Sequence, residues 1–210
     1  MANYLVTGGA GFIGSHIAEA LLKEGQRVRI LDNFSTGRRE NIKAVEMIAP
    51  SNLEIMEGDV RDRKACDLAV SGMDFVFHEA AQVSVPKSVH DPETTQEVNI
   101  RGTLNLLSAC KKAGSKRLVL ASSTAIYGDS PIEKDALKPK KEYLAPNPLS
   151  PYALSKLVGE YYCLLFSKIY NLPTVALRYF NVFGPRQDPN SEYAAVIPRF
   201  IERLLQETSP

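Results

Sequence analysis

The segment TGGAGFIG, residues 7–14, constrains the fold more than any other part of the chain. It follows an apolar run typical of a strand, residues 4–8, and is followed by apolar residues at helical spacing. Its glycines, Gly8, Gly11 and Gly14, permit a tight turn, close approach of the main chain to a pyrophosphate, and close packing of helix on strand. The helix that begins here would also point free N–H groups at the anion. We therefore predict a dinucleotide-binding turn, although a glycine-rich turn that binds nothing has the same local pattern.

The second predicted strand, residues 27–32, ends in Asp32. A carboxylate at this place can accept hydrogen bonds from both hydroxyls of an adenosine ribose, and it would repel a 2′-phosphate. The sequence thus favours NAD over NADP as the cofactor. Arg38 and Arg39 follow shortly afterwards and keep NADP open as the alternative.

Predicted strands alternate with predicted helices along the whole chain. Continuous apolar strands between amphipathic helices are typical of a parallel sheet that is covered on both faces. We predict an α/β fold, a Rossmann-like doubly wound parallel sheet with helices on both faces. The region 128–149 is rich in proline and charge and is predicted to be a surface loop. Further strands are expected at 53–57, 74–80, 117–123 and 174–180, and the longest helices at about 92–113 and 151–170.

The predicted helix at 151–170 carries more apolar residues than one packing face requires. A second partner would cover the surplus, and the simplest partner is another copy of the chain. We expect a homodimer through the helices around 92–113 and 151–170. Deep burial of this helix within one domain is the alternative.

Composition argues against several other classes of function. The formal net charge is +1, from 25 basic and 24 acidic residues, so nothing favours nucleic acid as a partner. Cys66, Cys110 and Cys163 lack the spacing of a metal site, and their odd number argues against a disulfide framework, so we expect them to be small buried side chains. No apolar run approaches the roughly 18 residues of a membrane span, and no leader precedes the first strand, which predicts a cytoplasmic protein.

Eight motifs, each modest alone, occur along the chain in a characteristic order. They are TGGAGFIGSH (7–16), LDNFSTGRREN (31–41), GDVRD (58–62), HEAAQVSVPKS (78–88), VNIRGT (98–103), SSTAIYG (122–128), SPYALSK (150–156) and LRYFNVFGPRQDP (177–189). With these motifs the chain resembles the extended short-chain dehydrogenase/reductases, in particular the NAD-dependent nucleotide-sugar epimerase/dehydratase family. It looks most like the branch of UDP-N-acetylglucosamine and UDP-glucose 4-epimerases.

The resemblance implies that NAD lies along the carboxyl edge of the sheet. Asp59 and Val60 would bracket the adenine, and Asn99 would be structural and close to the cofactor. Without the family, a turn at a strand end and a polar residue on a helix surface would be the simpler interpretations of Asp59 and Asn99. The resemblance implies further cofactor contacts from Phe12, Ile13, Asn33, Ser35, Thr36, Gly37, Ala80, Ala81, Gln82, Tyr152, Lys156 and Tyr179.

Tyr152 and Lys156 lie four residues apart, so in a helix their side chains project from the same face. Spacing alone does not distinguish them from a chance pair, but the resemblance implies that they and Ser123 are catalytic. Members of the family pass a hydride from a sugar alcohol to the nicotinamide while the tyrosine removes the hydroxyl proton, and a serine hydroxyl shares a hydrogen bond with the substrate oxygen. Because free tyrosine has a pKa of about 10, we expect the Lys156 ammonium and the nicotinamide to lower the pKa of Tyr152.

The two positions after Ser123 separate the reactions of the family. Dehydratases carry Asp and Glu there, whereas this chain has Thr124 and Ala125, so dehydration is not expected. The simplest remaining reaction is epimerisation at carbon 4 of a UDP-sugar through a transient 4-keto intermediate. UDP-GlcNAc and UDP-GalNAc are the first substrate pair, and UDP-Glc and UDP-Gal the second. The alternatives are a UDP-glucuronate epimerase or decarboxylase, and a domain that binds NAD without turnover.

The resemblance also implies a division of the chain into two parts. Residues 1–180 would form the NAD-binding domain with the catalytic residues, and residues 181–210 would begin a substrate lobe that continues further in other members, so we expect a fragment or truncated form. Substrate contacts are implied for Ser84, Ser123, Thr124, Tyr152, Asn181, Ala195 and Val196.

Overall fold

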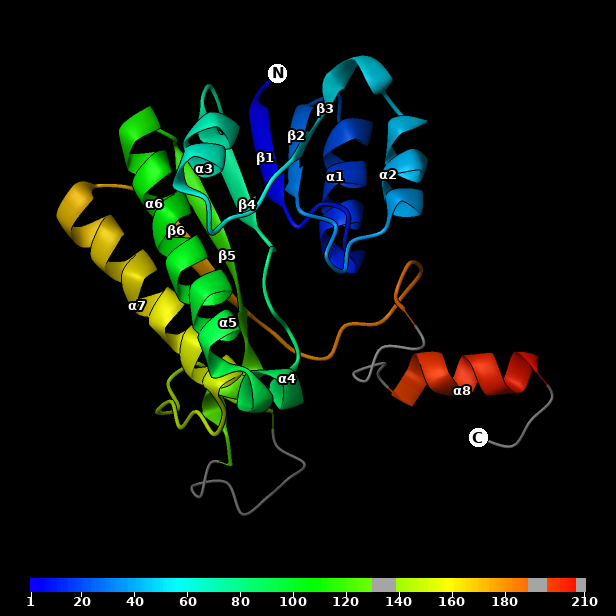
Figure 1. The fold of residues 1–210 in the computed structure, drawn as a ribbon, viewed down its shortest axis with the longest axis vertical. Coiled ribbons are helices and arrows are strands. Elements are labelled where there is room, and N and C mark those ends of the chain that lie inside the picture. The colour runs from blue at the N-terminus through cyan, green and yellow to red at the C-terminus, as the bar shows by residue number, and fades with distance from the viewer. Residues whose placement is uncertain (130–138, 189–195, 207–210) are drawn as a thin grey trace.

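The computed structural model describes residues 1–129, 139–188 and 196–206. Six parallel strands form one sheet in the order β3-β2-β1-β4-β5-β6 (Figure 1). The strand order reverses between β1 and β4, and ligands of doubly wound sheets bind beyond the carboxyl ends of the strands at such a point. The predicted Rossmann-like fold is therefore confirmed. The strands are β1 (Asn3–Thr7), β2 (Arg27–Asp32), β3 (Leu53–Glu57), β4 (Phe75–His78), β5 (Arg117–Ser123) and β6 (Thr174–Tyr179).

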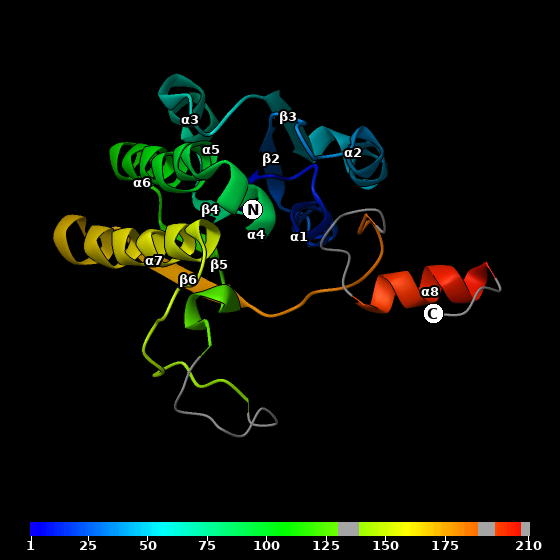
Figure 2. The same cartoon turned by 60° about the horizontal axis from the view of Figure 1, so that its bottom comes forward.

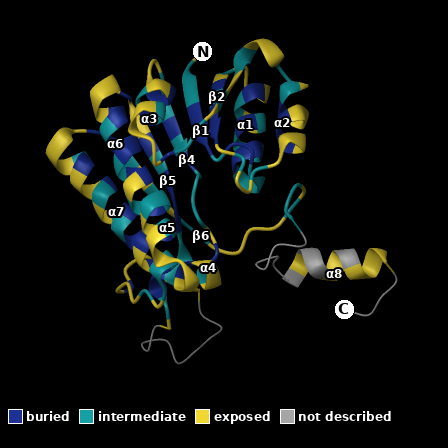
Figure 3. Ribbon diagram, in the orientation of Figure 1, coloured by how far each residue is buried: buried dark blue, intermediate teal, exposed yellow. Residues whose placement is uncertain are grey.

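Helices cover both faces of the sheet: α1 and α2 lie on one face, and α3, α6 and α7 lie on the other (Figure 2). Each face has its own apolar core, and the buried residues gather on the strands and on the helix sides turned toward them (Figure 3). The helices are α1 (Phe12–Lys23), α2 (Arg39–Glu46), α3 (Arg63–Val70), α4 (Val85–His90), α5 (Pro92–Gln96), α6 (Gly102–Ala113), α7 (Pro151–Tyr170) and α8 (Val196–Leu205), with short turns η1 (Pro50–Asn52), η2 (Glu97–Arg101) and η3 (Thr124–Tyr127).

The predicted elements are found, with two differences of detail. The strand expected at 74–80 is shorter, because β4 ends at His78. The single helix expected at about 92–113 is divided into α5, the π-helical turn η2 and α6. A π turn inserts one residue into a helix without ending it, so an apolar pattern at helical spacing does not reveal it. The surface loop was predicted at 128–149. Its described residues, between η3 and α7, form neither helix nor strand, and residues 130–138 lie outside the described residues.

The apolar surplus of α7 is not buried by this chain. Its inner side, with Leu157, Cys163 and Phe166, belongs to the core. The opposite side exposes about half of each of several large apolar side chains, so the alternative of deep burial within one domain is wrong. These exposed side chains are Leu154, Tyr161, Leu164, Leu165 and Ile169.

The three cysteines are buried and free, as predicted. Burial raises the pKa of each thiol to about 12. Within the described residues, no cluster of His, Cys, Asp and Glu side chains could hold a metal ion. No helix in that part of the chain is long and apolar enough to span a membrane.

Candidate functional site

The glycine turn leaves a cradle of main chain between β1 and α1. Gly8 has a φ of +69°, and a Cβ on it would lie 2.7 Å from the Ala80 nitrogen. A Cβ on Gly14 would overlap the Gly8 carbonyl oxygen. Gly11 precedes the helix and provides no side-chain cap, and the first turn carries no acidic residue. The N–H groups at this helix start are therefore open to an anion, and the cradle fits the pyrophosphate of a dinucleotide.

Asp32 fixes the turn from the end of β2. One oxygen of its carboxylate accepts a hydrogen bond from the Ala10 N–H (2.9 Å), and the other accepts one from the Phe34 N–H (2.8 Å). Gly37 packs so close that a Cβ there would lie 2.8 Å from Oδ1 of Asp32. Each carboxylate oxygen has a further lone pair, so the same group can accept hydrogen bonds from ribose hydroxyls. Asp32 thus has both a structural role and the geometry for the predicted one.

The two arginines that kept NADP open both pair with carboxylates. Arg38 lies 2.8 Å from Asp188, and Arg39 lies 2.9 Å from Glu57. The Arg39 guanidinium also lies 4.2 Å from the centre of the Phe34 ring. Both ion pairs are exposed, so they would hold the two arginines only weakly against a 2′-phosphate.

Asp59 organises the turn after β3. It accepts hydrogen bonds from Asn33 Nδ2 (2.8 Å) and from the fork of Arg61 (3.0 and 2.8 Å), and the Arg61 guanidinium lowers the pKa of this carboxyl to about 2. Asn105, which sequence reasoning missed, donates from Nδ2 to the carbonyl oxygens of Val60 and Arg61, both at 3.0 Å. The turn at the proposed adenine end is therefore fixed from two sides. Ser35 and Thr36 lie exposed beside it.

His78, the last residue of β4, is buried and neutral. Thr103 Oγ1 donates to the Asn99 carbonyl (2.6 Å), so His78 Nε2 must donate to Thr103 Oγ1 (3.0 Å). Nδ1 is then the acceptor of the hydrogen bond from the Thr7 hydroxyl (2.8 Å). Burial, reinforced by the charge of Lys156, lowers the pKa of His78 to about 3. This histidine ties β1, β4 and α6 together and is not an acid or base at neutral pH.

Asn99 lies in the π turn η2 and holds the main chain after β4. Its Oδ1 accepts from the Gln82 N–H (2.8 Å), and its Nδ2 donates to the Gln82 carbonyl (3.0 Å) and to Ser155 Oγ (2.9 Å). The segment with Ala80 and Ala81 is thereby fixed beside the glycine turn. The interpretation of Asn99 as a helix-surface residue is wrong, because it is buried. Ser84 caps α4, accepting from the Lys87 N–H (3.0 Å).

Ser123, Tyr152 and Lys156 come together at the carboxyl edge of the sheet, at the end of β5 and the start of α7. Tyr152 stands in the first turn of α7, where Ser150 caps the helix through the Ala153 N–H (3.1 Å). The Lys156 ammonium lies 5.8 Å from the centre of the Tyr152 ring and donates to the Ala121 carbonyl (2.8 Å). Thr124 directly follows Ser123 and begins η3. The geometry therefore joins the predicted catalytic residues in one cluster.

The electrostatics of this cluster differ from the expectation. Burial raises the pKa of Tyr152, and only a hydrogen bond with Ser123 acts in the opposite direction. The expected lowering of the Tyr152 pKa by the Lys156 charge is thus not found in this chain by itself. Burial also lowers the pKa of Lys156, to about 8, while the charge of Glu79 opposes this shift.

Glu79 is a further residue that sequence reasoning missed. It follows β4, and the Tyr179 hydroxyl at the end of β6 donates to its Oε1 (3.2 Å). Burial raises the pKa of Glu79 to about 7, and burial together with the Glu79 charge raises the pKa of Tyr179. The only signal in the sequence was an acidic residue directly before the Ala80–Ala81 pair.

Glu160 fixes α7 on the two strands beside it. It accepts from Ser122 Oγ (2.5 Å) and from Nε and Nη2 of Arg178 (3.0 and 2.9 Å). Arg178 also donates to the Tyr127 hydroxyl (2.8 Å). Since Glu160 is one turn beyond Lys156, this network also holds the part of α7 that carries Lys156.

The chain after β6 crosses the carboxyl edge of the sheet toward α1 (Figure 1). In this crossing segment, residues 180–188, Arg186 forms an ion pair with Glu19, and His16 Nε2 donates to the Pro185 carbonyl (3.0 Å). Of the predicted substrate residues, Asn181 is exposed in this segment. Ala195 lies outside the described residues. Val196 begins α8, which lies apart from the sheet in both ribbon views (Figures 1 and 2).

The family described as "NAD dependent epimerase/dehydratase family" matches residues 4–210. The chain belongs to this family. The UDP-glucose 4-epimerase of Mycolicibacterium smegmatis is 40% identical over 203 residues, which are 96% of this chain and 62% of that protein.

Two solved structures of the epimerase/dehydratase family resemble the fold closely. The UDP-N-acetylglucosamine 4-epimerase of Methanobrevibacter ruminantium, in complex with UDP-N-acetylmuramic acid, is 45% identical with a TM-score of 0.90, over 100% of this chain and 64% of that one. The UDP-glucose 4-epimerase of Thermus thermophilus, in complex with NAD, is 44% identical with a TM-score of 0.85, over 99% and 64%. The chain thus spans a little less than two thirds of these relatives.

Proposed function

We propose that this protein binds NAD and epimerises a UDP-sugar at carbon 4. The supporting observation is the cluster of Ser123, Tyr152 and Lys156 at the same sheet edge as the glycine turn. Similarity to 4-epimerases at 40–45% identity supports the same reaction. UDP-GlcNAc with UDP-GalNAc is the first substrate pair, and UDP-Glc with UDP-Gal is the second.

Bound NAD would supply a reversible acceptor for the hydride on carbon 4. The chain's own residues handle the proton: the Tyr152 oxygen takes it from the carbon-4 hydroxyl and returns it when the ketone is reduced on its other face. The Ser123 hydroxyl shares a hydrogen bond with the same sugar oxygen. Because burial raises the pKa of Tyr152, its phenolate needs nearby positive charge, and the Lys156 ammonium is the residue placed to provide it.

The side chains after Ser123 favour epimerisation over dehydration. Thr124 and Ala125 carry no carboxylate, so neither can act as the acid or base for eliminating water. A UDP-glucuronate epimerase or decarboxylase remains the second candidate, because the same three catalytic residues could begin either reaction.

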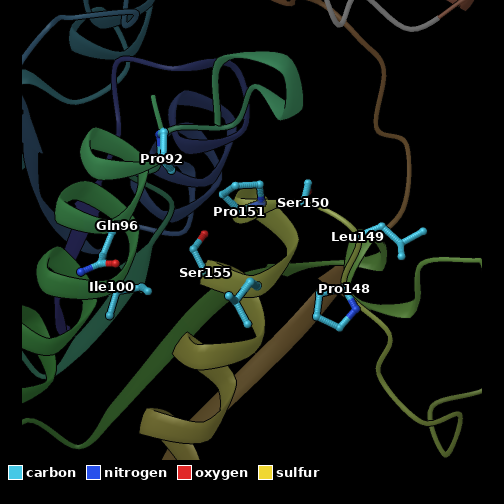
Figure 4. Close-up of a pocket in the computed structure, with 9 residues that line it drawn as sticks. Pro92, Gln96, Ile100, Pro148, Leu149, Ser150, Pro151 and Ser155 are labelled. Atoms are coloured by element: carbon cyan, nitrogen blue, oxygen red, sulfur yellow. The ribbon is translucent and has the colours of Figure 1, made fainter. Parts of the chain in front are cut away.

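We also propose that the protein pairs with a second copy through the helices around 92–113 and 151–170. Where α5 and η2 approach α7, a groove of about 480 Å³ runs between the two predicted interface helices (Figure 4). Its walls are largely apolar and continue into the exposed apolar side of α7 described above. The groove is lined by Pro92, Gln96, Ile100, Pro148, Leu149, Ser150, Pro151, Leu154 and Ser155.

The direct test of function is to incubate the purified protein and NAD with UDP-GlcNAc and UDP-Glc separately and to resolve the carbon-4 epimers by chromatography. We expect a mixture of epimers from at least one sugar, without net formation of NADH. The same incubation with UDP-glucuronate tests the second candidate, and a carbon-4 epimer of that sugar or release of CO₂ from it would favour that candidate. Binding of NAD with every sugar unchanged would show a binding domain without turnover.

A further inference from the structure

Glu79 places a carboxyl group inside the catalytic edge of the sheet. In the parallel register His78 lies opposite Leu120, so the next residue, Glu79, lies level with Ala121. The Ala121 carbonyl is the group that accepts the hydrogen bond from the Lys156 ammonium (2.8 Å). The Glu79 main chain, directly after β4, and the Lys156 ammonium, which reaches β5 from α7, therefore lie at the same level of the sheet.

The Glu79 carboxyl is held by a hydrogen bond from β6, the strand on the other side of β5 from β4. Tyr179 ends β6, and its hydroxyl donates to Glu79 Oε1 (3.2 Å). The Glu79 main chain is fixed as well, because its N–H donates to the Thr7 carbonyl (3.2 Å). A carboxyl with a tyrosine donor and an anchored main chain keeps one orientation, which a surface glutamate does not.

Lys156 needs an opposite charge because it is buried. An ammonium removed from water tends to lose its proton, and the Glu79 carboxylate opposes that loss. Another carboxylate, Glu160, lies one turn further along α7, but it is paired with the Arg178 guanidinium (3.0 and 2.9 Å). His78 is neutral with both ring nitrogens in hydrogen bonds, and Tyr152 and Tyr179 have raised pKa values. Burial raises the pKa of Glu79 to about 7. Above that pH its carboxylate is thus the group, among the described residues near Lys156, that can balance the ammonium charge.

We propose that the Glu79 carboxylate, oriented by the Tyr179 hydroxyl, is the counter-ion that keeps the Lys156 ammonium protonated. Glu79 is then a positioning residue that acts through Lys156. Its catalytic consequence rests on the proposed function, since a charged Lys156 is what makes Tyr152 usable as a base. Loss of the Glu79 charge should leave the fold intact and reduce the pH range over which the Lys156 ammonium persists.

The experiment follows the protonation of Lys156 directly, without any sugar. The protein is labelled with ¹³C-lysine, the Cε–Hε signals are titrated with pH by NMR, and Lys156→Met identifies the signal. In Glu79→Gln we expect the midpoint of Lys156 to fall by about one pH unit, the lower end of the effect of a nearby opposite charge. Tyr179→Phe should shift it in the same direction by less, because the carboxyl loses its donor but remains. Glu79→Asp should restore part of the shift.

Glu54→Gln is the matched control, because Glu54 is an exposed strand carboxylate that pairs with Arg29 away from this cluster. It should leave the Lys156 midpoint unchanged. An unchanged midpoint in a folded Glu79→Gln would overturn the proposal. If Glu79→Gln does not fold, an unchanged midpoint in Tyr179→Phe overturns it. Because the titration uses no substrate, its result is independent of whether the protein epimerises a sugar.

Discussion

The Asn99 side chain in the π turn binds both main-chain groups of Gln82, 17 residues earlier in the sequence. The same amide donates to Ser155 Oγ, which in turn donates to the Tyr152 carbonyl (2.7 Å). One buried side chain thus connects the segment after β4 with the first turn of α7.

Asn99→Ala should destabilise the protein by about 2–3 kcal/mol, because the N–H and carbonyl of Gln82 lose their partner. It should also weaken NAD binding, since the segment with Ala80 and Ala81 would no longer be held beside the glycine turn. Urea unfolding and NAD titration measure the two effects. Asn105→Ala is the matched comparison, because it removes two hydrogen bonds with the main chain as well, both to carbonyls and both at the turn after β3. An equal loss of stability with unchanged NAD affinity in Asn99→Ala would contradict the role given to Asn99.

Gly14→Ala should prevent formation of the glycine turn, because the new Cβ would overlap the Gly8 carbonyl and neither group can move freely. We expect a loss of several kcal/mol, the scale of severe steric strain. Gly25→Ala is the control: Gly25 has a φ of +70° but no atom within 4 Å of a Cβ, so only about 1–2 kcal/mol of backbone strain is expected. Similar unfolding midpoints for the two variants would disprove the steric argument.

Stability should depend on the titration of His78. Its pKa is lowered to about 3 in the folded chain, against about 6.5 when unfolded. The unfolded state therefore binds the proton first, and the contribution is complete above about pH 6.5 and declines by up to about 1.4 kcal/mol per pH unit toward pH 3. Glu79, whose pKa is raised to about 7, acts in the opposite direction between its unfolded and folded values.

The comparison of wild type with His78→Gln isolates the histidine. The difference in unfolding free energy between the two proteins should shrink as the pH falls from about 6.5, where the unfolded histidine begins to take up its proton. Denaturant unfolding at several pH values measures it. A difference that stays constant over this range would show that folding does not lower the pKa of His78.

Asp32→Asn should reduce NAD affinity and the preference for NAD over NADP together. The substitution removes the negative charge that repels a 2′-phosphate, and it replaces one acceptor of the Ala10 and Phe34 N–H groups by a donor. We expect a decrease of at least tenfold in NAD affinity, about 1.4 kcal/mol, measured by titration with both dinucleotides. Glu40→Gln, an exposed change at the start of α2, should leave both affinities unchanged. If Asp32→Asn still prefers NAD over NADP, other residues must distinguish the two dinucleotides.

Tyr152→Phe should lower the rate of epimerisation by about 10²–10⁴-fold, the usual contribution of an acid–base group, while NAD binding is retained. Tyr143→Phe, at a tyrosine that is 84% exposed, is the control and should retain full activity. The two rates are compared by chromatography of the sugar products. Equal rates would remove Tyr152 from the proposed mechanism.

The elements and the nucleotide turn were predictable because their signals are local. Apolar runs gave the strands, and the spacing of Gly8, Gly11 and Gly14 identified the turn, since each depends on a few neighbouring residues. The family resemblance brought in Ser123, Tyr152 and Lys156, which the structure joins in one cluster.

The remaining features depend on contacts between distant residues. The hydrogen bond from Tyr179 to Glu79 joins positions 100 residues apart, and the pKa of Tyr152 is set by burial under elements that no local pattern describes. The π turn was missed for a different reason, because it leaves the helical apolar pattern almost unchanged. These hydrogen bonds and pKa shifts depend on packing between distant parts of the chain, so they could not be predicted from local sequence.

The crossing segment, residues 180–188, has a mechanical consequence. It leaves the end of β6 beside the catalytic cluster, and its ion pair between Arg186 and Glu19 fastens it to the helix that begins at the glycine turn. A displacement of Arg186 would therefore be transmitted to α1 as well as to β6. Breaking the Arg186 pair would remove one of the connections between the chain after β6 and the helix that begins at the glycine turn.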